Sequence, residues 1–151
     1  KIIEQEALAW GIGEVSPAHI DAINIHRASL LAMRLAVDAL HTKLADGVRP
    51  PVLIDGRFTI PHLSSSQEAI VDGDADIFSI AAASIIAKEH RDALMHRMHD
   101  VYPAYGFDRH VGYATKQHRE AIFEHGITPE HRVTFCKNFP SSVLAQTPSS
   151  P

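Results

Sequence analysis

Apolar residues recur along the chain in two patterns, one typical of helices and one typical of short buried strands. Five residues spaced alternately by three and four predict one apolar helical face: Leu30, Met33, Val37, Leu40 and Leu44. The Asp46-Gly47 pair is expected to end this helix, because glycine readily takes the left-handed conformation after a last turn. A shorter helix is predicted from Pro17 to about Asn24, since Ser16 can cap it and proline fits the first helical position.

Short apolar runs bounded by turn residues predict strands. The run Val52–Asp55 lies between Pro50-Pro51 and Gly56, which suits a buried strand. Residues 69–71 repeat the pattern, and residues 7–15 (ALAWGIGEV) predict a further strand. Because strands and helices alternate, the sequence predicts an α/β fold.

The second half of the chain is predicted to be mostly helical. A long helix is expected over about 76–102, ended by Pro103 and Gly106. Residues 109–115 (RHVGYAT) predict a loop, after which Thr115 can cap a helix from 116 to about 124 that Gly126 closes. Residues 139–151 are rich in Ser and Pro, and we expect a frayed tail there.

Composition indicates one globular domain. The chain has 151 residues, of which 45% are hydrophobic and 21% charged, enough to bury a core. The net charge of −4 does not indicate a nucleic-acid binder, so any such role depends on a local patch. No run approaches the roughly 18 apolar residues of a membrane span, and we do not expect the residues at Lys1 to be a signal peptide, because no apolar core segment follows them. The single cysteine, Cys136, excludes an internal disulfide and a multi-cysteine zinc site, and fits a reducing compartment.

Two carboxylates carry the clearest chemical signal. Asp55 ends the first apolar run and Asp74, 19 residues later, follows the second, so both can reach one face of a sheet. Two carboxylates at strand ends can hold a hard divalent cation such as Mg²⁺, which needs few protein ligands besides phosphate oxygens and water. The alternative is that both are turn or cap residues.

Basic and histidine residues gather in the second half. Lys88 and Arg91 belong to its most basic segment and could contact phosphates, while Tyr113, in a glycine loop, could stack on a sugar or base. The alternative is a solvated helix face with Tyr113 as a core anchor. The many histidines match no zinc motif, and we expect them to be solvated or capping residues. Cys136 has no evident activating partner and is expected to be inert.

Several segments together resemble one family, bacterial ribonuclease HII (type 2 ribonuclease H). The most specific are the runs ASIIAKEHRD at 83–92 and GFDRHVGY at 106–113, which occur in one chain. Further matches are VLIDG at 52–56, AIV at 69–71, GDA at 73–75 and, upstream, residues 20–33. The resemblance covers roughly residues 7–135.

The resemblance implies a ribonuclease H-like mixed sheet flanked by helices, incomplete at the N-terminus. It implies a cytoplasmic endoribonuclease that cleaves RNA–DNA hybrids and ribonucleotides embedded in duplex DNA, using two Mg²⁺ or Mn²⁺ ions. Asp55 and Asp74 match the third and fourth of the family's four acidic residues. Tyr113 matches the tyrosine that helps to read the RNA-to-DNA junction, and Lys88 and Arg91 are expected to contact nucleic acid. No obligate protein partner is evident.

The sequence also departs from the family pattern. It contains neither the adjacent Asp-Glu pair of the family's first strand nor the Gly-Arg-Gly loop that senses the 2′-hydroxyl. Asp72 and Val111 stand where lysines are common, and both changes remove positive charge from a phosphate-facing site. We therefore expect residues 1–139 to be a partial catalytic domain with C-terminal helices, residues 140–151 to be a Ser/Pro-rich tail, and this chain alone to cleave weakly or not at all.

Two other functions remain open at this point. One is a catalytically dead nucleic-acid binding module, which Tyr113 and the basic segment favour. The other is a phosphoacceptor signalling domain, for which Asp55 is the candidate phosphorylation site. The second lacks the acidic pair after the first strand and the late-strand lysine that such chemistry requires.

Overall fold

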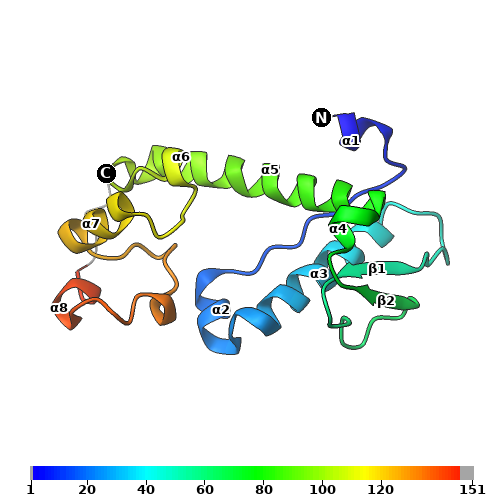
Figure 1. The fold of residues 1–151 in the computed structure, drawn as a ribbon, viewed down its shortest axis with the longest axis horizontal. Helices are drawn as coiled ribbons and strands as arrows, with labels where there is room; N and C mark the ends of the chain where they lie inside the picture. Colours follow the sequence, from blue (N-terminus) through cyan, green and yellow to red (C-terminus); the bar gives the residue numbers. More distant parts are fainter. Residues whose placement is uncertain (1, 147–151) are drawn as a thin grey trace. The chain divides into compact units, whose positions relative to one another are not determined.

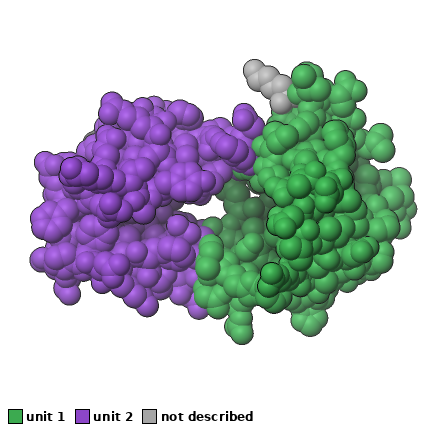
Figure 2. Space-filling view, viewed as in Figure 1, with its two compact units in different colours: residues 1–15, 23–87 green, residues 16–22, 88–151 purple. Residues whose placement is uncertain are grey.

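The computed structural model describes residues 2–146, which form two compact units. Unit 1 comprises described residues 2–15 and 23–87, and unit 2 comprises 16–22 and 88–146 (Figure 2). The main elements, drawn in Figure 1, are α1 (Ile2–Glu6), α2 (Pro17–Ile23), α3 (Ile25–His41), β1 (Val52–Asp55), β2 (Gln67–Ile70), α4 (Gly73–Asp76), α5 (Phe78–Val101), α6 (Phe107–His110), α7 (Lys116–His125) and α8 (Ser141–Leu144). Two 3-10 turns, Pro103–Tyr105 and Val133–Phe135, complete the set. The mixture of helices with a small sheet confirms the predicted α/β class.

Strands β1 and β2 form a parallel pair in unit 1, side by side in Figure 1. Val52 pairs with Gln67 and Asp55 with Ile70, so both strands end at the same edge. The Gly56 amide extends the ladder by donating to the Ile70 carbonyl at 2.8 Å. Both predicted strands are therefore confirmed, although the second runs over 67–70 rather than the predicted 69–71. The C-terminal edge carries the residues that follow each strand.

The predicted strand over residues 7–15 is wrong, because this segment packs on a helix rather than pairing with another strand. A Cβ atom at Gly13 would lie 1.9 Å from the Ala32 carbonyl oxygen, and one at Gly11 would lie 2.3 Å from that of Ala36. Both glycines therefore let the extended chain rest directly on the backbone of α3. The Lys43 ammonium fixes the same segment by donating to the Trp10 carbonyl at 2.7 Å.

The helices begin and end close to the predicted residues, with small shifts. α2 begins at Pro17 as expected, and the Ser16 hydroxyl accepts from the His19 amide at 3.3 Å. α3 ends at His41, before the predicted Asp46-Gly47 pair, and the Thr42 amide closes its last turn on the Asp38 carbonyl at 3.3 Å. α5 is slightly shorter than predicted, since the acidic turn before it forms the separate helix α4.

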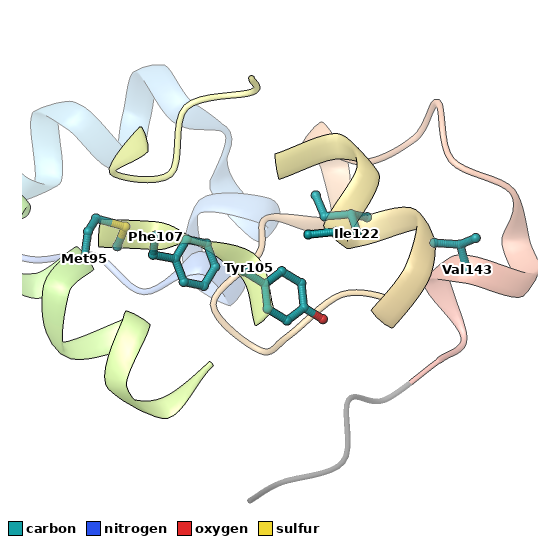
Figure 3. Packing of buried hydrophobic residues seen from close by; sticks show 6 residues of the cluster. Met95, Tyr105, Phe107, Ile122 and Val143 are labelled. Carbon is teal, nitrogen blue, oxygen red and sulfur yellow. The ribbon is translucent and has the colours of Figure 1, made fainter. Parts of the chain in front are cut away.

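Unit 2 is organised around an apolar core. Helices α5–α8 and the 3-10 turn Pro103–Tyr105 contribute the side chains of this core. Its buried members are Met95, Tyr105, Phe107, Ala121, Ile122 and Val143, and Figure 3 shows six residues of this cluster. Tyr105 is 2% exposed, and its hydroxyl donates to the Gly126 carbonyl at 3.0 Å, which satisfies its polar end. The core thereby ties the end of α7 to the turn after α5.

The segment expected to be a frayed tail is ordered over the part that the structure describes. Residues 141–144 form α8, and Val143 is buried in the unit 2 core. Apolar burial thus outweighs the Ser/Pro composition from which the tail was predicted, and residues 147–151 lie outside the described part. Between residues 2 and 146, no helix is long and apolar enough to cross a membrane.

Candidate active site and nucleic-acid interface

Asp55 ends β1 and takes part in the turn after β2. Its side-chain oxygen Oδ1 accepts a hydrogen bond from the Gly73 amide at 3.0 Å. An ionised carboxylate has about four acceptor positions on its two oxygens, so this bond leaves acceptor capacity for a cation. Asp55 is exposed to solvent. Its neighbour Ile54 is 4% exposed and anchors the strand.

Asp74 directly follows Gly73 in the sequence and lies in the first turn of α4. Because the Gly73 amide contacts the Asp55 carboxylate, the two acidic residues predicted to act together are brought to the same edge of the sheet. Asp72 precedes them with φ of 55°, the left-handed conformation that turns the chain from β2 into α4. Asp74 is exposed, so its carboxylate is accessible from solvent.

The donor set fits a hard divalent cation only in part. Carboxylate oxygens suit Mg²⁺ and Mn²⁺, and Mg²⁺ is often held by one or two carboxylates with water and phosphate. Within residues 2–146, however, no group of three or more acidic, His or Cys residues is placed to hold a metal. Asp55 and Asp74 alone therefore do not make a complete metal site within the described residues.

Lys88, Arg91 and Tyr113 form the candidate nucleic-acid interface, and all three belong to unit 2. Lys88 pairs with Asp92 one turn along α5, and this hydrogen bond is the main cause of its raised pKa, to which Tyr113 adds a smaller contribution. Arg91 donates to the Val111 carbonyl at 3.3 Å, which links α5 to the loop that carries Tyr113. The predicted interface residues are thus brought together, with positive charge beside an aromatic ring.

Tyr113 is 71% exposed, so the alternative that it anchors the core is wrong. Its loop is held close to α5, because a Cβ atom at Gly112 would lie 3.0 Å from the Arg91 guanidinium and 3.1 Å from the Met95 sulfur. Val111 has φ of 42°, which is an outlier for a β-branched side chain and costs about 1–3 kcal/mol. A strained backbone beneath an exposed aromatic ring is typical of a ligand-contacting loop.

Three histidines in unit 2 are buried, so the expectation that the histidines are solvated or capping is wrong for them. His110, His118 and His131 are 7%, 6% and 8% exposed. Nε2 of His118 and Nε2 of His131 are 3.0 Å apart, and the rings of His110 and His118 stack with centroids 4.5 Å apart. Burial, and then the neighbouring His118, lower the pKa of His131 to about 4, and burial also lowers the pKa of His118. These positions match no metal motif, so no sequence signal distinguished them.

Asp21 and Cys136 serve the structure of unit 2. Asp21 accepts from the amides of Val133 and Thr134 at 2.6 and 3.0 Å, and so fixes the start of the second 3-10 turn to α2. Cys136 is 6% exposed, and burial raises the pKa of its thiol. A buried, protonated thiol fits the predicted inert role.

Comparison with known proteins places these features in a family. The sequence model of the family described as ribonuclease HII matches residues 1–138. The chain belongs to the ribonuclease HII family. It is 52% identical over 141 residues to a protein named ribonuclease HII from Bacteroides thetaiotaomicron, covering 89% of this chain and 65% of that protein. It is 46% identical over 138 residues to ribonuclease HII of Clostridioides difficile, covering 91% of this chain and 52% of that protein.

A third relative, ribonuclease HII of Neisseria meningitidis, is 44% identical over 136 residues, covering 89% of this chain and 67% of that protein. The chain spans about 65% of the length of the Bacteroides relative, so what the whole relatives do is carried to this chain only as a proposal. The family assignment confirms the predicted resemblance.

Proposed function

We propose that this chain is part of an endoribonuclease that hydrolyses the RNA strand of RNA–DNA hybrids and ribonucleotides embedded in duplex DNA. The observation that carries the proposal is the hydrogen bond from the Gly73 amide to Asp55, which brings Asp55 and Asp74 to one sheet edge. Membership of the ribonuclease HII family supports the same reaction class.

Asp55 and Asp74 are proposed as metal ligands for Mg²⁺ or Mn²⁺. When bound, such ions activate a water molecule and stabilise the leaving 3′-oxygen of the cleaved phosphodiester. The two side chains are exposed, so they can hold cations that also contact a phosphate of the substrate.

Lys88, Arg91 and Tyr113 are proposed to bind the duplex. The two cations can contact backbone phosphates, which supply most of the affinity for nucleic acid. The exposed Tyr113 ring offers a face on which a sugar or base can stack. The chain's net charge of −4 makes this local patch, rather than the overall charge, the source of attraction.

We further propose that residues 1–139 belong to the catalytic domain and that residues 140–151 follow it as a Ser/Pro-rich segment, whose described part docks through Val143. The proposal includes a cytoplasmic location, because RNA–DNA hybrids and embedded ribonucleotides arise where a bacterium keeps its DNA.

The test is cleavage of a DNA duplex that contains one ribonucleotide, in Mg²⁺ or Mn²⁺. We would compare the 151-residue chain with a chain extended upstream to the length of its relatives, each with an Asp55→Asn variant. We expect cleavage by the extended chain, its loss in Asp55→Asn, and weak or no cleavage by the short chain. An extended chain that folds but does not cleave in either metal would refute the proposed function.

A second candidate is a nucleic-acid binding module without catalysis. It is favoured by the adjacency of Lys88, Arg91 and Tyr113 in unit 2. Binding of the extended chain to a hybrid that depends on salt but is followed by no cleavage would favour this function.

A further inference from the structure

Two of the buried histidines, His131 and His118, form a chain of hydrogen bonds in which the donor of each bond can be assigned. The Thr128 amide donates to Nδ1 of His131 at 3.0 Å, so the hydrogen of a neutral His131 is on Nε2. That Nε2 can then donate to Nε2 of His118, 3.0 Å away. Nε2 of His118 is therefore an acceptor and its hydrogen is on Nδ1, which donates to the Tyr113 carbonyl at 2.9 Å.

The third histidine holds the same loop from its other end. Nε2 of His110 donates to the Tyr105 carbonyl at 2.8 Å, which leaves Nδ1 as the acceptor for the Gly112 amide at 3.3 Å. The Tyr113 amide donates to the His110 carbonyl at 2.8 Å. Residues 111–113 are thus fixed by buried groups on both sides.

The loop needs such support, because its own conformation is unfavourable. Val111 is held at φ of 42°, and the Tyr113 side chain, 71% exposed, has little packing of its own. The direction in which the ring points therefore depends on its backbone. His118 holds that backbone through the Tyr113 carbonyl, and a partly buried hydrogen bond of this kind favours the observed loop conformation over alternatives.

We propose that His118, kept in the Nδ1-protonated tautomer by His131, is a positioning residue for substrate binding. It fixes the carbonyl of Tyr113 and thereby presents the Tyr113 ring to the nucleic acid. The inference rests on the proposed function, since it assumes that Tyr113 contacts the substrate.

Two substitutions of His118 separate positioning from bulk packing. In His118→Asn the side-chain amide can replace the Nδ1 donor to the Tyr113 carbonyl, whereas His118→Leu leaves that carbonyl with the Thr115 amide, at 2.8 Å, as its remaining donor. In the upstream-extended chain we expect His118→Leu to raise KM for the ribonucleotide-containing duplex about 3- to 10-fold, the size of one hydrogen bond, with kcat nearly unchanged. His118→Asn should recover most of the KM. His96→Leu, at an exposed position of α5, is the matched control and should change neither parameter.

A double-mutant cycle provides the readout that a merely structural role would not give. If His118 acts through Tyr113, His118→Leu should not raise KM further in a Tyr113→Ala background. Equal, additive effects in both backgrounds would overturn the proposal, as would a fall in kcat with an unchanged KM.

A tautomer measurement keeps the proposal testable without activity. The ¹⁵N shifts of the folded 151-residue chain at neutral pH should show His118 protonated at Nδ1 and His131 at Nε2. The opposite tautomers would overturn the inference and leave the proposed function intact. If the extended chain neither cleaves nor binds the duplex, the proposed function fails, and the role of His118 in substrate binding fails with it.

Discussion

Acid should destabilise unit 2 because it protonates a histidine that the folded state keeps neutral. His131 is 8% exposed, and its two ring nitrogens are engaged by Thr128 and His118. The other side of His131 borders a pocket of about 300 Å³ whose acidic lining residue, among those described, is Asp21. Asp21 already accepts hydrogen bonds from Val133 and Thr134, and none of the carboxylates within residues 2–146 contributes to the pKa of His131.

The magnitude follows from the pKa of His131 in the two states. It is lowered from 6.5 to about 4 on folding, chiefly by burial and then by His118. Between these two values the unfolded state binds more protons than the folded state. His131 therefore does not lower the free energy of unfolding above pH 6.5, lowers it progressively as the pH falls from 6.5 to about 4, and lowers it no further below that. The difference corresponds to about 3 kcal/mol, at roughly 1.4 kcal/mol per pH unit. His118, whose pKa is also lowered by burial, contributes in the same direction.

The assay is urea unfolding at a series of pH values from 7.5 to 4, monitored by the near-ultraviolet circular dichroism of tyrosine. All three tyrosines of the chain lie in unit 2, whereas its one tryptophan, Trp10, lies in unit 1, so the tyrosine signal reports on the relevant unit. His131→Gln should be less stable at pH 7.5 and should lose most of the pH dependence, since glutamine does not titrate. His96→Gln should retain the wild-type dependence.

A second titration in the same unit falls outside this window. Burial acts to raise the pKa of Asp21, but the hydrogen bonds from Thr134 and Val133 outweigh it and lower the pKa below 3.8. Its contribution is therefore present above pH 3.8 and is lost only as the pH falls further.

Two results would refute the prediction for His131. One is a free energy of unfolding that stays constant between pH 6.5 and 4.5, and the other is an equal pH dependence in His131→Gln.

Four other substitutions test separate features of the chain. Asp55→Asn in the upstream-extended chain should abolish cleavage while leaving the melting temperature within a few degrees of wild type; retained cleavage would remove Asp55 as a ligand. Gly13→Ala should destabilise unit 1 by at least about 1–3 kcal/mol, because the new Cβ would meet the backbone of α3. The control, Ser29→Ala on the exposed side of α3, should change the free energy of unfolding by less than about 0.5 kcal/mol. Tyr113→Ala should weaken hybrid binding by about 1–3 kcal/mol, the value of one stacked ring, with stability unchanged; equal binding would exclude stacking. Lys88→Gln should reduce the slope of log affinity against log salt by about one, and an unchanged slope would mean that Lys88 contacts no phosphate.

The elements that could be predicted are those whose signal is local. The apolar run before Asp55 is bounded by prolines and a glycine, and it forms β1 as predicted. Thr115 and Gly126 bracket α7, and the Thr115 hydroxyl accepts from the His118 amide at 3.2 Å. Such caps depend on neighbours a few residues away, which the sequence displays directly.

The failures depend on contacts between distant residues. The 7–15 segment has the composition of a strand, but whether it pairs or packs is decided by the α3 backbone that its glycines meet. The buried histidines are spread from residue 110 to 131, and only the fold of unit 2 brings His118 and His131 to 3.0 Å. That Asp55 and Asp74 lie near one another could be predicted because the ends of parallel strands converge, a rule of topology that needs no knowledge of side-chain contacts.

The positive φ of Val111 has a consequence for the evolution of this chain. Selection for heat resistance alone would favour Gly or Asn at position 111, since either takes a left-handed conformation with less strain than a β-branched residue. The relaxed loop would gain stability and lose the rigidity with which it presents its aromatic ring. Thermostable variants of this chain are therefore expected to trade substrate affinity for melting temperature at this one position.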